Sequence, residues 1–129
     1  MKLIITFILT IILISFTDIT GQENGEEIIL PQNIVETITI AIQCENDGVK
    51  KSSMSMIGKY KLKQACCVLI EQFGKETNLD YKYLIARVIY MVGCDLSVEK
   101  FRTVLKEEQA TELKYFCELL HNNYLFAKK

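Results

Sequence analysis

Apolar side chains recur every three or four residues along most of this chain, and this spacing predicts amphipathic helices. No stretch shows the strict apolar–polar alternation of a half-buried strand. The pattern therefore predicts an all-α fold, a small bundle or array of four to five helices. The expected helices cover residues 31–45, 59–73, about 78–93, 97 onward, and about 108–121.

The apolar face of each expected helix predicts which side chains form the core. In the second helix these are Leu62, Ala65, Cys66, Leu69, Ile70 and Phe73. In the third they are Tyr81, Leu84, Ile85, Val88 and Val92. The last helix directs Ala110, Leu113, Phe116, Cys117 and Leu120 inward.

Turn-forming residues set the expected helix ends. Residues 45–48 (ENDG) would end the first helix, and residues 50–58 (KKSSMSMIG) predict a serine-rich loop. Gly74 is expected as a left-handed C-cap of the second helix. Asn78 or Asp80 would cap the start of the third.

Further signals concern the other ends. Pro31 suits the first turn of the first helix, Gly93 would stop the third, and Ser97 would cap the fourth. Only KEEQ (106–109) separates the last two segments, so they form either two helices or one bent rod. No internal sequence repeat is recognised.

The start of the chain, residues 1–21, predicts a secretory signal peptide. An apolar and hydroxyl run, residues 3–15 (LIITFILTIILIS), follows Lys2; it is too short to cross a bilayer as a mature helix. Cleavage is expected after Gly21 or after Thr17. The chain is therefore expected to be secreted and extracellular, without stable membrane insertion.

Beyond the signal peptide (1–21), residues 22–30 predict a mobile acidic arm and residues 31–129 a single helical domain. The whole chain carries a formal net charge of −1. Nucleic acid and anionic membrane surfaces both require clustered basic charge. The near-neutral balance therefore predicts no nucleic-acid partner.

The chain has five cysteines, which fits an exported domain reinforced by disulfides. The preferred pairs are Cys44 with Cys66 or Cys67, and Cys94 with Cys117, each contributing on the order of 3 kcal/mol. Because five is odd, one thiol remains over. It is either buried and inert or available for a disulfide-linked dimer through Cys66 or Cys67.

The same cysteines do not predict a metal, cofactor or catalytic site. Adjacent helical side chains diverge by about 100°, so Cys66 and Cys67 are poorly placed to bind one ion, and a CxxC motif is missing. The Cys-Cys pair resembles the Cys-Cys-x-x-His-Asp motif of secreted phospholipases A2. However, Ile70 and Glu71 replace its histidine and aspartate. The single histidine, His121, is expected near a helix C-terminus. We therefore expect that the protein is not an enzyme.

Three hypotheses for function follow. The first is a venom, salivary or reproductive effector that engages an extracellular protein target, and another is a helical cytokine-like signal. The alternative is a carrier of a small apolar ligand. It is loosely similar to insect odorant-binding proteins in its signal peptide, its helices and the cysteines Cys44, Cys67, Cys94 and Cys117, although the cysteine spacing differs. A carrier should enclose an apolar cavity, whereas an effector should have a filled core and an exposed apolar or charged patch.

Overall fold

The computed structural model describes residues 29–129, and all of their regular secondary structure is helical. They form six α-helices and are 79% helical, with no strand. The all-α fold is therefore confirmed. The expected signal peptide and nearly all of the expected acidic arm lie outside the described residues.

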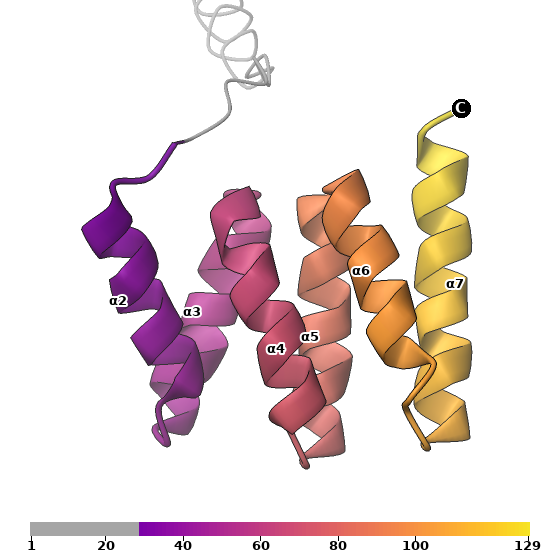
Figure 1. Ribbon diagram of the computed structural model, residues 1–129, viewed down its shortest axis with the longest axis horizontal. Helices are drawn as coiled ribbons and strands as arrows, with labels where there is room; N and C mark the ends of the chain where they lie inside the picture. Colours follow the sequence, from indigo (N-terminus) through magenta and orange to yellow (C-terminus); the bar gives the residue numbers. More distant parts are fainter. Residues whose placement is uncertain (1–28) are drawn as a thin grey trace, which may run out of the picture.

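The helices are arranged as three consecutive antiparallel pairs (Figure 1). The first pair is α2 (Gln32–Gln43) with α3 (Asp47–Lys59). After a short 3-10 helix, η2 (Lys63–Ala65), the second pair is α4 (Cys66–Lys75) with α5 (Leu79–Val92). The third pair is α6 (Asp95–Leu105) with α7 (Thr111–Ala127). Helices α3, α5 and α7 pack in sequence along one layer, and α2, α4 and α6 along the other.

The segment expected as a serine-rich loop is helix α3, so that prediction was wrong. Asn46 caps the helix by accepting a hydrogen bond from the N–H of Val49. Met54 and Ile57, at helical spacing, are fully buried. The apolar stripe of this helix was missed in the sequence because it contains few apolar residues and serines stand between them.

Helix α4 also begins and ends differently from the prediction. It begins at Cys66 rather than at residue 59, after a turn in which Lys61 adopts a left-handed conformation with φ 50°. Gly74 is not a C-cap but lies inside α4. The helix ends instead at Lys75, and the backbone turns to an extended conformation at Glu76.

In the third pair, Ser97 is buried inside α6 and does not cap it; Cys94 occupies the N-cap position. Helices α6 and α7 are separate rather than one bent rod. Helix α7 continues to Ala127 instead of ending near residue 121. The Tyr124 hydroxyl donates to the carbonyl of Gly93 and to the carboxylate of Asp95, which ties this extension to the rest of the chain.

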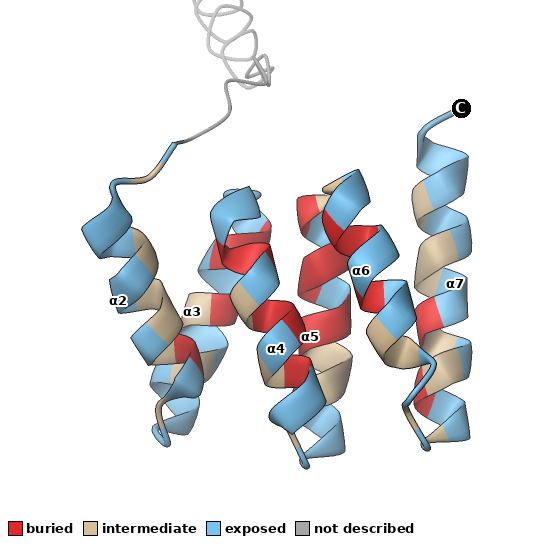
Figure 2. Cartoon of the chain, in the orientation of Figure 1, coloured by how far each residue is buried: buried red, intermediate tan, exposed pale blue. Residues whose placement is uncertain are grey.

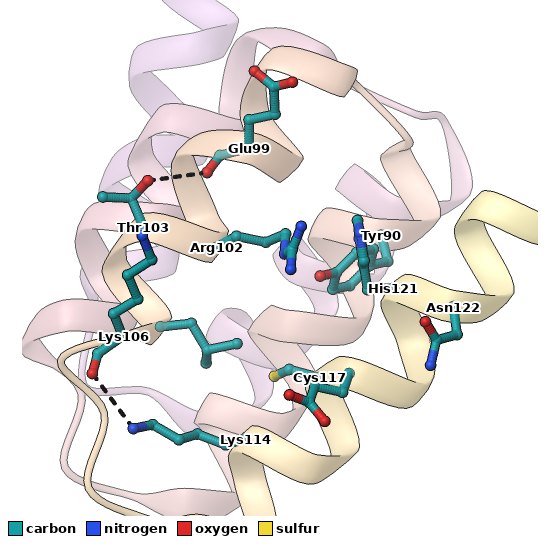
Figure 3. Close-up of a pocket in the computed structure, with 11 residues that line it drawn as sticks. Tyr90, Glu99, Arg102, Thr103, Lys106, Lys114, Cys117, His121 and Asn122 are labelled. Atoms are coloured by element: carbon teal, nitrogen blue, oxygen red, sulfur yellow. Dashed lines mark hydrogen bonds between the residues drawn. The ribbon is translucent and has the colours of Figure 1, made fainter.

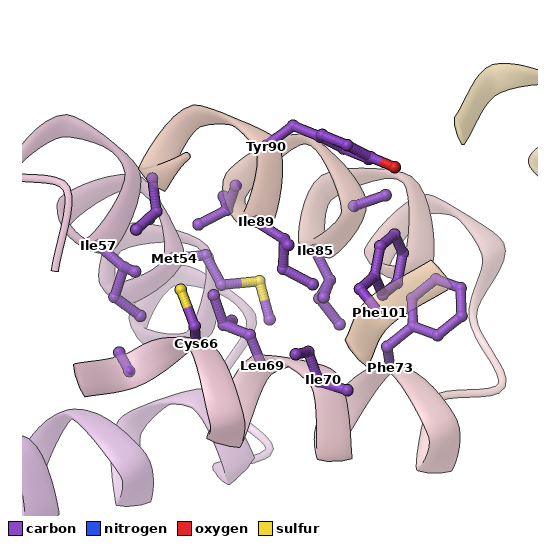
Figure 4. Packing of buried hydrophobic residues seen from close by; sticks show 14 of the residues in the cluster. Met54, Ile57, Cys66, Leu69, Ile70, Phe73, Ile85, Ile89, Tyr90 and Phe101 are labelled. Carbon is purple, nitrogen blue, oxygen red and sulfur yellow. The ribbon is translucent and has the colours of Figure 1, made fainter. Parts of the chain in front are cut away.

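The apolar core lies between the two layers and is densely occupied (Figures 2 and 4). At its centre, the Phe101 ring of α6 packs edge-on against Phe73 of α4, with ring centroids 4.9 Å apart. It also packs against Tyr90 of α5 at 6.0 Å. These contacts join the third helix pair to the second.

The second helices of the three pairs begin at a constant interval along the chain. Helices α3, α5 and α7 begin at Asp47, Leu79 and Thr111, so each begins 32 residues after the one before it. We call this step the repeat interval. The fourth residue of each helix is a lysine: Lys50, Lys82 and Lys114. The chain is therefore a short array of helical hairpins, a regularity that the sequence analysis missed.

Two ion pairs connect successive hairpins at equivalent positions. Lys50 of the first pair contacts Glu76 in the turn of the second, with Nζ and Oε2 3.5 Å apart. Lys82 of the second contacts Glu108 in the turn of the third at 2.5 Å. Side-chain exposure is only 8–15% for the Lys82–Glu108 pair and 9–14% for the Lys50–Glu76 pair. We call these two contacts the bridging ion pairs.

The glutamates of the bridging ion pairs are held ionised. The hydrogen bond from Lys82, aided by the N–H of Ala110, lowers the pKa of Glu108. For Glu76, burial acts to raise the pKa, but hydrogen bonds from the Asn78 N–H and from Gln72 outweigh it, so that the pKa is lowered. Both carboxyl groups therefore release their protons more readily in the folded chain than in the unfolded chain.

This difference makes stability dependent on pH. The contribution of the bridging ion pairs is complete above the ordinary glutamate pKa of 4.5 and is lost as the pH falls through the lowered folded values. Denaturant unfolding at a series of pH values should show the free energy of unfolding falling below about pH 4.5. A Glu76→Gln, Glu108→Gln double variant should show a flatter profile; identical profiles would contradict this assignment.

Candidate functional site

The third helix pair is opened by a cleft of about 640 Å³ between α6 and α7 (Figure 3). Arg102 and Lys106 line it from α6, and Lys114 and His121 from α7. Tyr90 of α5 also lines it. Unlike the tightly packed helices of the first two pairs, α6 and α7 make few contacts with each other.

The register of the repeat explains why this pair is open. In the second pair, Ile70 of α4 and Ile89 of α5 are buried in the core. One repeat interval later, the equivalent positions of the third pair carry Arg102 and His121. A guanidinium and an imidazole cannot be buried against each other without hydrogen-bond partners, so the two helices stay apart.

Unpaired polar groups converge in this cleft. The buried hydroxyl of Tyr90 and Nδ1 of His121 have no hydrogen-bond partner, and their rings lie 6.0 Å apart. The Arg102 guanidinium is directed toward them (Figure 3). Among residues 29–129 the Arg102 side chain makes no hydrogen bond or ion pair. All three groups can donate hydrogen bonds, but none of them is paired with the carboxylates of Glu99 and Glu118, which also line the cleft.

The protonation states follow from burial. Burial raises the pKa of Tyr90 to about 12, with a smaller upward effect of Cys117 and an opposing effect of Arg102. Burial and the positive charge of Arg102 both lower the pKa of His121. At neutral pH the cleft therefore presents an uncharged phenol and imidazole beside a cationic guanidinium.

Lys114 lies beside the cleft without the acidic partner that its equivalents have. Lys50 and Lys82 each contact a glutamate in the following hairpin. Lys114 instead donates to the carbonyl oxygen of Lys106 at 3.4 Å. Within residues 29–129 no hairpin follows α7, so a third bridging ion pair is not formed.

The outer face of α7 carries three exposed apolar side chains. Tyr115, Leu119 and Phe126 are 64%, 45% and 79% exposed. With about 100° per residue they lie within about 40° of one another, on the side opposite the buried Leu113 and Cys117. We call these three residues the α7 outer face; Figure 2 shows α7 exposed along most of its length.

A second, smaller hollow of about 350 Å³ lies at the other end of the array. Its walls are apolar and come from α2, α3 and the segments beside them: Leu30, Ile34, Ile38, Met56, Tyr60 and Leu62. Both hollows open to the surface. Neither is the enclosed apolar cavity expected of a ligand carrier.

The five cysteines are all free, and no two lie at disulfide distance. The expected Cys44–Cys66 or Cys44–Cys67 bridge and the expected Cys94–Cys117 bridge are therefore not formed. Cys66 and Cys117 are buried in the core, whereas Cys67 is exposed.

Burial decides the reactivity of the two core cysteines. It raises the pKa of Cys66 to about 11 and that of Cys117 to about 12. These two thiols stay protonated at neutral pH and are poor nucleophiles. By contrast, hydrogen bonding with Ser97 lowers the pKa of the half-buried Cys94.

Few of the residues at this end of the array were predicted from the sequence to belong to a site. His121 was expected at a helix C-terminus but stands in the middle of α7 and lines the cleft. Arg102 and Lys114 were not singled out. The available signal was the even spacing of Lys50, Lys82 and Lys114, which appears only when segments one repeat interval apart are compared.

Comparison of the chain with protein-family models, curated proteins and solved structures finds no match. No helix among residues 29–129 is both long and apolar enough to span a membrane. Any assignment of function therefore rests on the geometry of the third helix pair.

Proposed function

We propose that the protein is a secreted, non-enzymatic binding protein that engages an extracellular protein target through its third helix pair. The observation that carries this proposal is the α7 outer face. Among the described residues no helix covers this face, and the exposed end of a helical array usually carries a polar face to stay soluble. Three large apolar side chains on that face therefore favour a protein partner that covers them.

The hairpin register supports the same conclusion. On α5, Tyr83 and Tyr90 form the face on which α7 packs; the Tyr83 ring lies 5.0 Å from the ring of Phe116 in α7. One repeat interval later, the position of Tyr83 is taken by Tyr115. Tyr115 thus occupies the register of a helix-packing residue, although no helix is bound to it within the described residues, whereas Leu119 corresponds to the exposed Arg87 of α5.

The filled core favours a protein target over an apolar ligand. Fully buried side chains such as Phe73, Ile85 and Phe101 occupy the space between the layers. The larger hollow has charged walls and is open, which does not suit an engulfed lipid. The carrier hypothesis consequently has less support than the effector hypothesis.

Export remains part of this proposal. It rests on the apolar N-terminal run. Peptide mapping of the exported protein tests it, because the mapping reports the mature N-terminus.

Binding to target cells tests the role of the α7 outer face. Labelled protein should bind saturably to cells of a target tissue, with competition by unlabelled protein. A Tyr115→Ser, Leu119→Ser, Phe126→Ser variant should lose at least about 100-fold in affinity, since interface anchors each contribute on the order of 1–2 kcal/mol. Its circular dichroism should remain that of the native protein because all three side chains are exposed.

The matched control is an Ile40→Ser, Val49→Ser, Leu79→Ser variant. These apolar residues are 69%, 45% and 50% exposed but lie outside the third helix pair. The control should bind as the wild type does. Equal affinity of the two triple variants would contradict the proposal, as would a dimer in light scattering that the α7 variant abolishes without any change in cell binding.

A further inference from the structure

We propose that the target presents a helical hairpin that continues the array, with a carboxylate in its turn bound to Lys114 and a bulky side chain seated in the α6–α7 cleft. This inference rests on the proposed function and specifies the chemistry of the partner. It follows from how each helix pair in the chain is attached to the one before it.

The bridging ion pairs show that each following hairpin supplies a carboxylate from its turn. Besides its lysine, Glu76 accepts hydrogen bonds from the N–H groups of Thr77 and Asn78. Glu108 accepts from those of Gln109 and Ala110 in the same way. Each carboxylate is thereby fixed in the turn between two helices, with one oxygen left for the lysine of the preceding hairpin.

Lys114 is the equivalent lysine of the last hairpin. It is the fourth residue of α7, as Lys50 and Lys82 are of α3 and α5. Its contact with the Lys106 carbonyl is a neutral acceptor at 3.4 Å, which a carboxylate would replace with a stronger, charge-assisted hydrogen bond. A partner carboxylate placed like Glu76 or Glu108 would form a third bridging ion pair.

The cleft can accommodate a side chain at the position equivalent to the one that Phe101 occupies on the preceding helix pair. Phe101 of α6 packs against Phe73 and Tyr90 of the preceding pair. One repeat interval after Phe73 and Tyr90 stand Leu105 and Asn122, and both line the cleft. The space between them corresponds to the position that a Phe101-like side chain of a following hairpin would occupy.

The unpaired groups of the cleft indicate that the inserted side chain carries a hydrogen-bond acceptor. The Tyr90 hydroxyl, His121 and Arg102 can all donate hydrogen bonds toward the cleft. An inserted side chain with an acceptor at its tip would pair with them, whereas a purely apolar one would leave them unpaired. Because the Arg102 side chain is exposed, it can swing aside as the side chain enters.

A second copy of this chain does not place a carboxylate at the required position, since its nearest turn carboxylate, Glu45, is one residue further along. A copy that docked through its exposed first pair would present Cys44 at the position of Glu76 and Glu108. The Cys44 thiol is instead directed to the carbonyl of Asn46. The occupant is therefore a hairpin of a different protein.

The test uses a hairpin peptide of residues 64–93 as the probe, with Cys66→Ser and Cys67→Ser to prevent oxidation, and titrates it into the full chain. The peptide contains α4, α5 and the turn glutamate Glu76. Calorimetry should detect saturable binding. Lys114→Met in the chain and Glu76→Gln in the peptide should each weaken it about tenfold, and the two together should weaken it no further than either alone.

Lys100→Met serves as the control because Lys100 is an exposed lysine of α6. It should leave the affinity unchanged. Absence of saturable binding, or additive effects of the Lys114 and Glu76 changes, would overturn the proposed hairpin partner.

The cell-binding assay separates this inference from the proposed function. Lys114→Met should weaken binding to target cells about tenfold. If Lys114→Met binds as the wild type does while the α7 outer-face variant loses binding, the hairpin inference fails and the proposed function stands. If neither variant loses binding to cells, the proposed function fails, whatever the peptide shows.

Discussion

Replacement of Phe101 by alanine is expected to lower the free energy of unfolding by about 3–5 kcal/mol. The Phe101 side chain is fully buried and contacts rings of both helices in the second pair. Alanine would leave a cavity between Phe73 and Tyr90, at the junction that holds the third pair to the second. Guanidinium unfolding followed by circular dichroism measures the loss.

Leu96→Ala is the matched control for this change. Leu96 lies on the same helix but is 76% exposed, so its loss should be under about 0.5 kcal/mol. If the alanine variant of Phe101 does not fold, Phe101→Leu carries the test, with an expected loss of about 1–1.5 kcal/mol. Similar losses at positions 96 and 101 would mean that Phe101 does not join the pairs.

Glu108→Ala is expected to lower the free energy of unfolding by about 2–4 kcal/mol at neutral pH. The change removes the acceptor of three hydrogen bonds at once, from Lys82 and from the N–H groups of Gln109 and Ala110. The Lys82 side chain is only 15% exposed and would be left without its counter-charge. The expected loss therefore exceeds that of a surface ion pair.

The neighbouring glutamate provides the control. Glu107 is exposed, and its side chain forms no ion pair within residues 29–129. Glu107→Ala should change stability by less than about 0.5 kcal/mol. Comparable losses for the two variants would show that the bridging ion pair contributes little.

Local sequence signals predicted the second helix pair best. Asn78 caps α5 by accepting hydrogen bonds from the N–H groups of Asp80 and Tyr81, as expected. Gly93 ends that helix in the left-handed conformation, with φ 69°. These predictions were correct because capping depends on residues within one turn of the helix end.

Predictions failed where contacts with distant residues determine the structure. Gly74 was expected to end a helix. The chain turns at Glu76 instead, whose carboxylate accepts hydrogen bonds from the following backbone and from Lys50 of another helix. Helix α3 was missed because burial of Met54 and Ile57 by neighbouring helices outweighs the weak helix preference of its serines.

The site at the third pair was hidden for a related reason. Equivalent positions of the three hairpins share a role but seldom a residue type, as Ile57, Ile89 and His121 illustrate. The lysines are an exception, since they recur in all three. The geometry of the array was needed before His121 and Arg102 could be recognised as polar substitutes for buried isoleucines.

The cysteine at position 44 gives the array a head and a tail that do not fit each other. Subunits whose two ends are complementary, and whose contacts do not close into a ring, grow into filaments. Here one end presents a lysine, Lys114, and the other lacks the matching glutamate. Head-to-tail association of copies is thereby disfavoured by a single side chain, Cys44. This asymmetry agrees with the proposal that the α7 outer face binds a foreign partner.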